Sequence, residues 1–323
     1  MPSRCCCDPP NPLPLSPFSL PRQVIVAWST ARWSIPLPQS HRFPIGKYRL
    51  VRDGVIARGV LPAAAIQEPE RVDRATLGLV HEPEYVDQVL GGTLSEASLR
   101  RLGFPWSPLL SERSLRTVQG TLEAARDALT RGFGINLAGG THHAFPAHGE
   151  GFCVFNDVSV AIRALLRDGR IRRAAIVDLD VHQGNGTARV FESDPRVFTF
   201  SMHGARNYPF HKERSRLDVE LEDGVGDSEY LATLDPELER VLDDASPDLV
   251  VYIAGADPYG DDRLGRLALS IDGLARRDAR VFDACWHRSI PVAIVLGGGY
   301  ARDLGDVVTI HANTVRELLA RYA

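Results

Sequence analysis

An apolar run that ends in two aspartates and a histidine limits the fold of this chain more than any other feature. Residues 174–187 read AAIVDLDVHQGNGT, so a hydrophobic stretch gives way to Asp178, Asp180 and His182 and then to glycines. In an open α/β sheet, reacting groups gather beyond the carboxyl ends of the strands. Alternate residues of an extended backbone lie on one side, so Asp180 and His182 can reach one ion. A helix-capping aspartate and a buried core histidine are the structural alternative.

Three further apolar runs end in reactive residues beside glycine. They are Gly-Gly-Thr-His142-His143 after residues 135–138, Gly-Ala-Asp257 after residues 249–254, and Gly-Gly-Gly-Tyr300 after residues 292–296. The last of these lacks the Lys-Ser/Thr pair of a P-loop, which disfavours a phosphate-binding loop at Gly297–Gly299. Four reactive strand ends predict a catalytic edge on a parallel sheet.

The remaining pattern predicts an α/β fold, a single-domain three-layer sandwich with a mostly parallel sheet flanked by helices. From residue 111 to 131, apolar residues recur at helical spacing, as in a helix packed against a sheet. Strands alternating with such helices indicate a parallel sheet covered on both faces. Further helices are expected at 157–167, 228–244, 270–288 and 304–322, and further strands at 24–28, 77–81 and 197–201.

Composition excludes several other classes of protein. A net charge of −4 and a hydrophobic content of 44% fit a globular protein without a nucleic-acid footprint. No apolar run reaches the roughly 20 residues of a membrane span, and a secretory signal is missing, so a cytoplasmic protein is expected. Residues 1–23 are proline-rich without amphipathic period, which predicts a disordered leader, or a misassigned start, before a catalytic domain at 24–323. Cys153 and Cys285 are expected to be buried free thiols.

Together these motifs resemble the histone deacetylase family of the arginase/deacetylase superfamily. The resemblance runs from about His41 to the C-terminus. The segments VVYIAGAD (250–257) and GDDRLG (260–265), and His41-Arg42-Phe43-Pro44 with Lys47, resemble the class IV branch and its bacterial relatives. The resemblance implies a zinc-dependent hydrolase of acylated lysine.

The family's three metal ligands match Asp180, His182 and Asp257 of this sequence. Three protein ligands leave a position open for water or substrate, as in catalytic zinc sites. Two carboxylates and one imidazole suit Zn²⁺ but would also accept Fe²⁺, Co²⁺ or Mn²⁺. The resemblance also implies an inner K⁺ site at Asp178, Ser201 and the backbone carbonyls near Asp180 and His182.

Catalytic roles are implied for the histidine pair and a tyrosine. His142 and His143 match the family's base and acid, with Asp178 accepting a hydrogen bond from His142. Asn185 stands where class I members carry Asp, so His143 should titrate lower, because an amide stabilises imidazolium less than a carboxylate does. Tyr300 matches the tyrosine whose hydroxyl points at the scissile carbonyl.

The substrate channel is implied at Gly151, Phe152, Tyr208 and Leu264, and the rim segment 102–106 lacks the acidic residue that anchors peptides in many class I and II members. The predicted function is removal of acyl groups, acetyl to long-chain fatty acyl, from lysines of proteins or peptides. Deacetylation of acetylpolyamines is the alternative, and a binding module without turnover or a binuclear manganese site is disfavoured by the motifs. The oligomeric state stays open.

Overall fold

The computed structural model describes residues 24–38 and 40–323, so the predicted leader at 1–23 lies outside the described residues. This part of the chain forms one eight-stranded sheet in the order β2-β1-β3-β8-β7-β4-β5-β6, and every strand pair is parallel. The strands are β1 (Ala27–Trp28), β2 (Ile66–Gln67), β3 (Phe133–Asn136), β4 (Ala174–Asp178), β5 (Val197–Gly204), β6 (Leu217–Leu221), β7 (Leu249–Ile253) and β8 (Val292–Val295).

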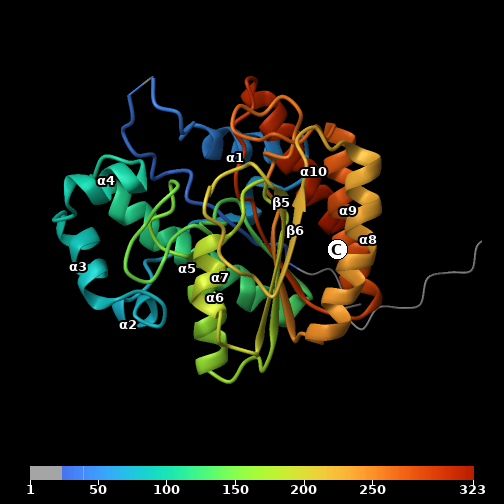
Figure 1. The fold of residues 1–323 in the computed structure, drawn as a ribbon, viewed down its shortest axis with the longest axis horizontal. Helices are drawn as coiled ribbons and strands as arrows, with labels where there is room; N and C mark the ends of the chain where they lie inside the picture. The colour runs from blue at the N-terminus through green and yellow to red at the C-terminus, as the bar shows by residue number, and fades with distance from the viewer. Residues whose placement is uncertain (1–23, 39) are drawn as a thin grey trace, which may run out of the picture.

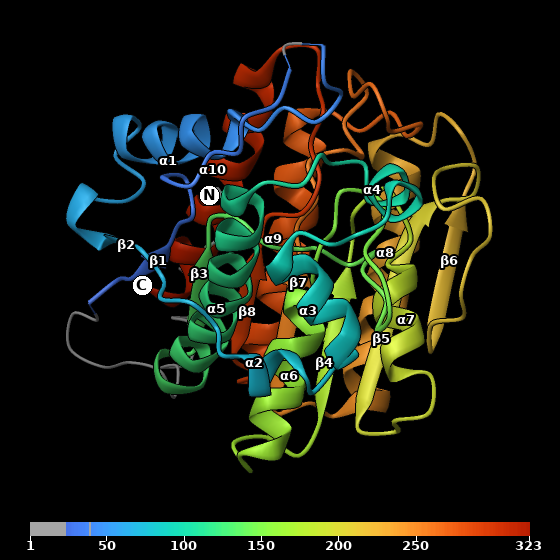
Figure 2. The same cartoon turned by 90° about the vertical axis from the view of Figure 1, so that its left-hand side faces the viewer.

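Helices cover both faces of the sheet, as Figures 1 and 2 show. One layer consists of α1 (Lys47–Ala57), α8 (Asp227–Ala245), α9 (Ile271–His287) and α10 (Leu304–Tyr322). The opposite layer consists of α5 (Pro108–Arg131), α6 (Asp157–Arg167) and α7 (Asn185–Phe191). Outside α5 and α6 lie α2 (Arg74–Leu77), α3 (Pro83–Gly91) and α4 (Glu96–Leu102), at the left of Figure 1, and a short 3₁₀ turn spans Ala63–Ala65. The predicted three-layer α/β fold is confirmed.

The central strands are apolar throughout because both of their faces are covered. In β4, Ala175 and Val177 pack into the core under α8–α10, while Ala174 and Ile176 pack into the core under α5 and α6. This alternation is the side-chain period of an extended strand, and burial on both sides removes the polar half of the pattern. No helix in the described part of the chain combines the length and apolar character that crossing a bilayer requires.

The strand predicted at 77–81 is wrong. Asp73 caps α2 by accepting a hydrogen bond from the Thr76 amide at 2.7 Å. The chain then turns, since the amides of Val80 and His81 both donate to the Leu77 carbonyl. The apolar residues here are buried by tertiary packing rather than by a sheet. Helix α5 begins at Pro108 instead of residue 111 because Ser107 caps it.

Four neighbouring strands bring the reactive segments together. The order β3-β8-β7-β4 is continuous in the middle of the sheet, and all four strands point the same way. Their carboxyl ends carry, in that order, the His142–His143 pair, Tyr300, Asp257 and the Asp180–His182 pair. The predicted catalytic edge is therefore a contiguous stretch of this sheet.

Candidate active site

Three buried residues at this edge form a cluster that could hold a metal ion. One potential ligand atom from each of Asp180, His182 and Asp257 lies within 4.8 Å of the others. The His182 Nδ1 atom is 3.0 Å from Asp180 Oδ1 and 3.2 Å from Asp257 Oδ2. The other carboxylate oxygens are held by backbone amides, because Val181 donates to Asp257 Oδ1 and Gly298 donates to Asp180 Oδ2.

The charge of this cluster fits a cation. Burial and the neighbouring charge of Asp180 raise the pKa of Asp257 to about 6, so two buried carboxylates are costly without a positive partner. Asp257 Oδ2 is buried and has no hydrogen-bond donor in suitable geometry. A Cβ at Gly298 would lie 1.8 Å from that oxygen, so only glycine leaves room there. Oxygen and imidazole donors with space between them suit a divalent transition metal.

His142 is paired with a carboxylate. Its Nδ1 donates to Asp178 Oδ2 at 2.7 Å, which leaves Nε2 facing the cluster, 3.9 Å from Asp180 Oδ1. Burial opposes protonation of His142, but the charges of Asp178 and Asp180 outweigh it and raise its pKa to about 9. Asp178 therefore orients the ring and favours its charged form.

His143 is paired with an amide, which a third residue holds in place. Its Nδ1 is 2.7 Å from Asn185 Oδ1, and Asn185 Nδ2 donates to Glu150 Oε1 at 2.7 Å. A carboxylate only accepts, so Glu150 forces the Asn185 oxygen towards His143, whose Nδ1 must then carry the proton. Burial, followed by the charges of His142 and His182, lowers the pKa of His143 well below its ordinary value, whereas the hydrogen bond with Asn185 acts in the opposite direction.

Tyr300 lies at the end of the glycine turn that follows β8. Its ring is buried at an angle of 86° to the His182 ring, with the ring centroids 6.4 Å apart. Asp262 fixes the turn by accepting a hydrogen bond from the Tyr300 amide at 2.6 Å. Gly299 has a φ of +149°, a conformation that strains other residues, so the turn needs glycine to present the tyrosine. Burial first, and then the charges of Asp257 and Asp180, keep the Tyr300 pKa well above 10.

Comparison with known proteins places this arrangement in a family. The histone deacetylase domain model matches residues 41–315. The chain belongs to the histone deacetylase family. It is 47% identical to an uncharacterised protein of Picosynechococcus sp. over 277 residues, covering 86% of this chain and 92% of the relative. It is 35% identical to histone deacetylase 2 of Arabidopsis thaliana over 282 residues, covering 83% of this chain and 72% of the relative.

A solved structure shares the deacetylase fold. The HDA15 HD domain superposes with a TM-score of 0.77 at 22% identity, covering 93% of this chain and 89% of the other. The expected resemblance from about His41 onward agrees with the matched region. Membership of the histone deacetylase family supports a hydrolytic lysine deacetylase in general terms.

The predicted channel residues of this deacetylase domain surround the approach to the histidines and Tyr300. Tyr208 lies edge-on to His143, with ring centroids 4.9 Å apart, and its hydroxyl donates to Glu150 Oε1 at 2.7 Å. Phe152, at φ +67°, stands with Gly151 and Leu264 among the lining residues of the same cavity. The Leu264 carbonyl accepts from Asn207 Nδ2 at 2.7 Å, which fixes that wall.

Two residues predicted to bind an inner cation, Asp178 and Ser201, lie side by side on neighbouring strands. Asp178 and Ser201 are paired in register on β4 and β5, and both are buried. Asp178 Oδ1 accepts from the Asp180 amide at 3.2 Å, and Ser201 Oγ is 2.9 Å from His203 Nδ1. An inner cation site at these residues stays a prediction.

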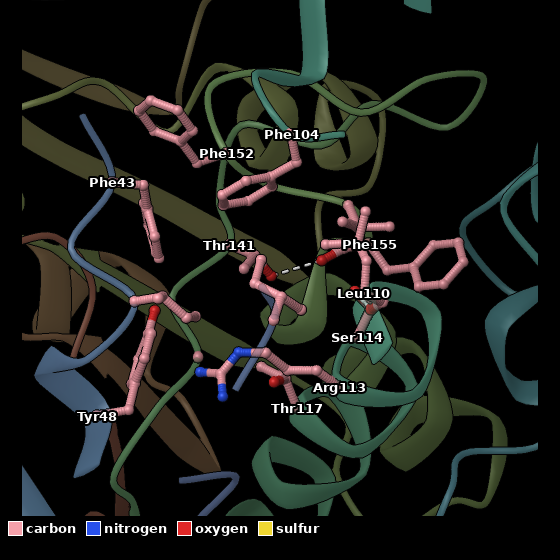
Figure 3. A pocket seen from close by; sticks show the side chains of 14 residues that line it. Phe43, Tyr48, Phe104, Leu110, Arg113, Ser114, Thr117, Thr141, Phe152 and Phe155 are labelled. Carbon is pink, nitrogen blue, oxygen red and sulfur yellow. Dashed lines mark hydrogen bonds between the residues drawn. The ribbon is translucent and has the colours of Figure 1, made fainter. Parts of the chain in front are cut away.

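A small, mostly apolar cavity of about 40 Å³ (Figure 3) adjoins the cavity that is lined by Asp180, His182, Asp257 and Tyr300. The two cavities share Phe43, Tyr48, Gly139, Thr141 and Phe152 as lining residues. Figure 3 shows Phe104 and Phe152 closing one side and the Arg113 guanidinium beside Tyr48, 3.9 Å from its ring centroid.

Sequence reasoning missed two contributors to the deacetylase site. Glu150 was overlooked because nothing in the sequence pairs it with Asn185, 35 residues away. Lys47 was noted without a role; its buried ammonium lies 3.4 Å from the carbonyls of Gly297 and Gly299 and 5.0 Å from the Tyr300 ring centroid. The free, buried state predicted for Cys153 and Cys285 is confirmed.

Proposed function

We propose that this protein is a metal-dependent amidohydrolase that removes acyl groups from lysine side chains of proteins or peptides. The observation that carries the proposal is the buried Asp180–His182–Asp257 cluster, with a carboxylate oxygen that accepts no well-aligned hydrogen bond, beside two histidines and Tyr300. Amide hydrolysis needs an electrophile at the carbonyl, a base for water and an acid for the leaving amine. One cavity contains residues suited to each role.

Asp180, His182 and Asp257 would hold the metal, which we take to be Zn²⁺, with Fe²⁺, Co²⁺ or Mn²⁺ as alternatives of the same ligand preference. When bound, such an ion polarises a carbonyl and makes water more acidic. Asp178 and Ser201, with the backbone carbonyls near Asp180 and His182, would hold K⁺ beneath it.

The two histidines divide the proton transfers in this proposal. Glu150 and Asn185 leave His143 Nε2 as a bare acceptor, so His143 takes the proton of the attacking water. His142 is held next to a carboxylate that favours its charged form, so it supplies a proton to the leaving amine. Tyr300 keeps its hydroxyl proton and donates a hydrogen bond to the oxygen that becomes negative in the transition state.

The walls of the channel suit the four methylenes of lysine, because Phe152, Tyr208 and Leu264 offer apolar surface beside the histidines. We extend the substrate range from acetyl to long-chain fatty acyl groups because the apolar cavity adjoins the catalytic one. Its volume of about 40 Å³ is the space of roughly three water molecules. A long chain therefore requires lining side chains such as Phe104 to rotate.

Acetylpolyamines fit the channel mouth less well than acyl-lysine peptides do. Among the described residues, those that line the mouth include Arg42, Arg101 and Arg263 and no carboxylate, so a substrate with further ammonium groups would be repelled. We assign the chain to the class IV branch on the motifs around His41 and Asp257.

Turnover of acyl-lysine peptides graded from acetyl to myristoyl, beside acetylated polyamines, tests this function. The purified protein is stripped with a chelator and reloaded with Zn²⁺, Fe²⁺, Co²⁺ or Mn²⁺. We expect peptide deacylation that is lost on stripping and restored by at least one metal. Full activity in the stripped protein, or turnover of acetylpolyamines alone, would contradict the proposal.

A further inference from the structure

The mouth of the channel is strongly basic although the whole chain carries a net charge of −4. A cleft of about 950 Å³ leads down to His143, His182 and Tyr300. Its lining includes six exposed arginines, here called the arginine rim: Arg42, Arg100, Arg101, Arg206, Arg263 and Arg266. No Asp, Glu or Lys stands among the described residues that line this cleft.

Half of the arginine rim is not neutralised by neighbouring carboxylates. Arg100 pairs with Glu96 at 3.4 Å, while Arg206 and Arg266 share Asp223 at 3.7 and 3.1 Å. Within residues 24–38 and 40–323, the other three rim arginines have no carboxylate within ion-pair distance; they are Arg42, Arg101 and Arg263. A concave surface of one charge sign concentrates its field, so this mouth attracts anions.

The rim arginines come from four separate segments that line the cleft above the channel. Arg42 precedes α1, Arg100 and Arg101 end α4, Arg206 follows β5, and Arg263 and Arg266 follow β7. When an acyl-lysine side chain occupies the channel, its neighbours in the peptide must lie across this rim, since each residue spans at most about 3.6 Å. Guanidinium groups bind carboxylates in a two-pronged geometry that suits aspartate and glutamate side chains.

We propose that the arginine rim selects acyl-lysine peptides whose flanking residues are acidic. This preference rests on the proposed function, because an acyl-lysine bound in the channel determines where the flanking residues of the peptide lie. It predicts weak use of lysine- and arginine-rich tails, whose charge the rim repels. A peptide explains the rim better than a nucleic acid does, because the unneutralised arginines line the cleft above a narrow channel on a protein of net negative charge.

Peptides that share one central acyl-lysine and differ only in their flanks test the preference. Two Asp or Glu residues, two Ser residues, or two Lys residues are placed beside the acyl-lysine. One exposed arginine–carboxylate pair changes affinity by roughly 1.4- to 5-fold. We therefore expect kcat/KM to be about tenfold higher for acidic than for basic flanks, mainly through KM, and the difference to shrink as salt is raised to 0.5 M.

Charge reversal on the rim provides the matched variants. Arg42→Glu with Arg101→Glu should abolish or invert the preference while kcat on the Ser-flanked peptide stays similar. Arg172→Glu is the control, because Arg172 is 89% exposed and lies before β4, at the opposite edge of the sheet. Equal kcat/KM for all flanks, or the same loss in the control, would overturn the proposal.

Binding measurements separate this proposal from the proposed function. Fluorescence anisotropy with labelled acidic and basic peptides reports the preference even if no peptide is hydrolysed. Tighter acidic-peptide binding without turnover would reject the deacylase and keep the rim. Turnover without any flank preference would keep the deacylase and reject the role of the rim. Tighter binding of a DNA duplex than of the acidic peptide would also overturn the assignment of the rim to peptides.

Discussion

Replacing Glu150 should impair catalysis through Asn185 rather than through folding. Glu150 Oε1 accepts hydrogen bonds from Asn185 Nδ2 and from the Tyr208 hydroxyl, each at 2.7 Å. Hydrogen bonds from His148, Asn185 and Tyr208 outweigh the burial of Glu150 and lower its pKa, so it stays ionised at neutral pH. Without it, the Asn185 amide is free to turn its NH₂ group towards His143 and to remove the acceptor that holds the imidazole.

The size of the effect follows from the bond that is lost. A hydrogen bond to a charged group contributes about 1.5–3 kcal/mol, so Glu150→Ala should lower kcat by roughly 10- to 100-fold with a smaller change in KM. Asn185→Asp should also be impaired, because it places two carboxylates at a hydrogen-bond distance where both cannot stay ionised. Adding Glu150→Gln to Asn185→Asp supplies an amide donor to the new carboxylate and should restore activity.

A double-mutant cycle in kcat on an acetyl-lysine peptide measures this coupling, with circular dichroism and metal content confirming intact protein. We expect a coupling energy of about 1–3 kcal/mol in the direction of rescue. His148→Ala is the matched control, since its 3.5 Å contact with the other Glu150 oxygen should cost less than about fivefold. Independent effects of the two substitutions would refute the link between Glu150 and Asn185.

Four further predictions follow from the same geometry. Asp180→Ala and Asp257→Ala should each lose bound metal by elemental analysis together with activity, and stoichiometric metal with near-normal turnover would reject the ligand set. Tyr300→Phe should keep metal and fold but lower kcat by about a hundredfold or more, because one oxyanion donor contributes roughly 3–4 kcal/mol. A change in KM alone would show that Tyr300 only lines the pocket. Decanoyl- or myristoyl-lysine should exceed acetyl-lysine at least tenfold in kcat/KM, because each buried methylene contributes about 0.8 kcal/mol, and a flat series would exclude the apolar cavity as an acyl site. Burial lowers the pKa of His81 from 6.5 to about 4, so the unfolded chain binds this proton more readily than the folded chain does. The contribution of neutral His81 to folding stability is therefore complete above pH 6.5 and is lost as the pH falls towards 4. Urea unfolding should show about 2 kcal/mol less stability at pH 5 than at pH 7 from this residue, and His81→Gln should reduce the pH dependence by that amount.

The sequence by itself determined the fold class and the reactive strand ends. Buried parallel strands leave an uninterrupted apolar run, and the residues after it stand out as polar groups beside glycine, as at 174–182 and 292–300. Helix α10 was predicted at its observed bounds because its apolar stripe repeats over five turns. Local signals of this kind depend only on neighbouring residues, so they can be recognised without knowing the packing.

The bounds of short strands and of strands at the edge of the sheet could be determined only from the tertiary structure. The strand predicted at 24–28 shortens to Ala27–Trp28, β2 comprises two residues, too few for any period to show, and β6 is only partly buried at the edge of the sheet. The residues at 77–81 have the composition of a strand, but Asp73 and the packing of His81 against the Asn156 amide make them a turn. Burial by segments distant in the sequence decides the structure of these residues, and the local sequence pattern carries no information about that burial.

The finer chemistry of the site was also decided by the fold alone. The order β3-β8-β7-β4 brings side chains separated by up to 158 residues, from His142 to Tyr300, into one cavity. Glu150 reaches Asn185, and four separate segments contribute to the arginine rim, only because the strand ends converge. Hydrogen bonds and fields depend on distance in space, whereas the sequence specifies distance along the chain.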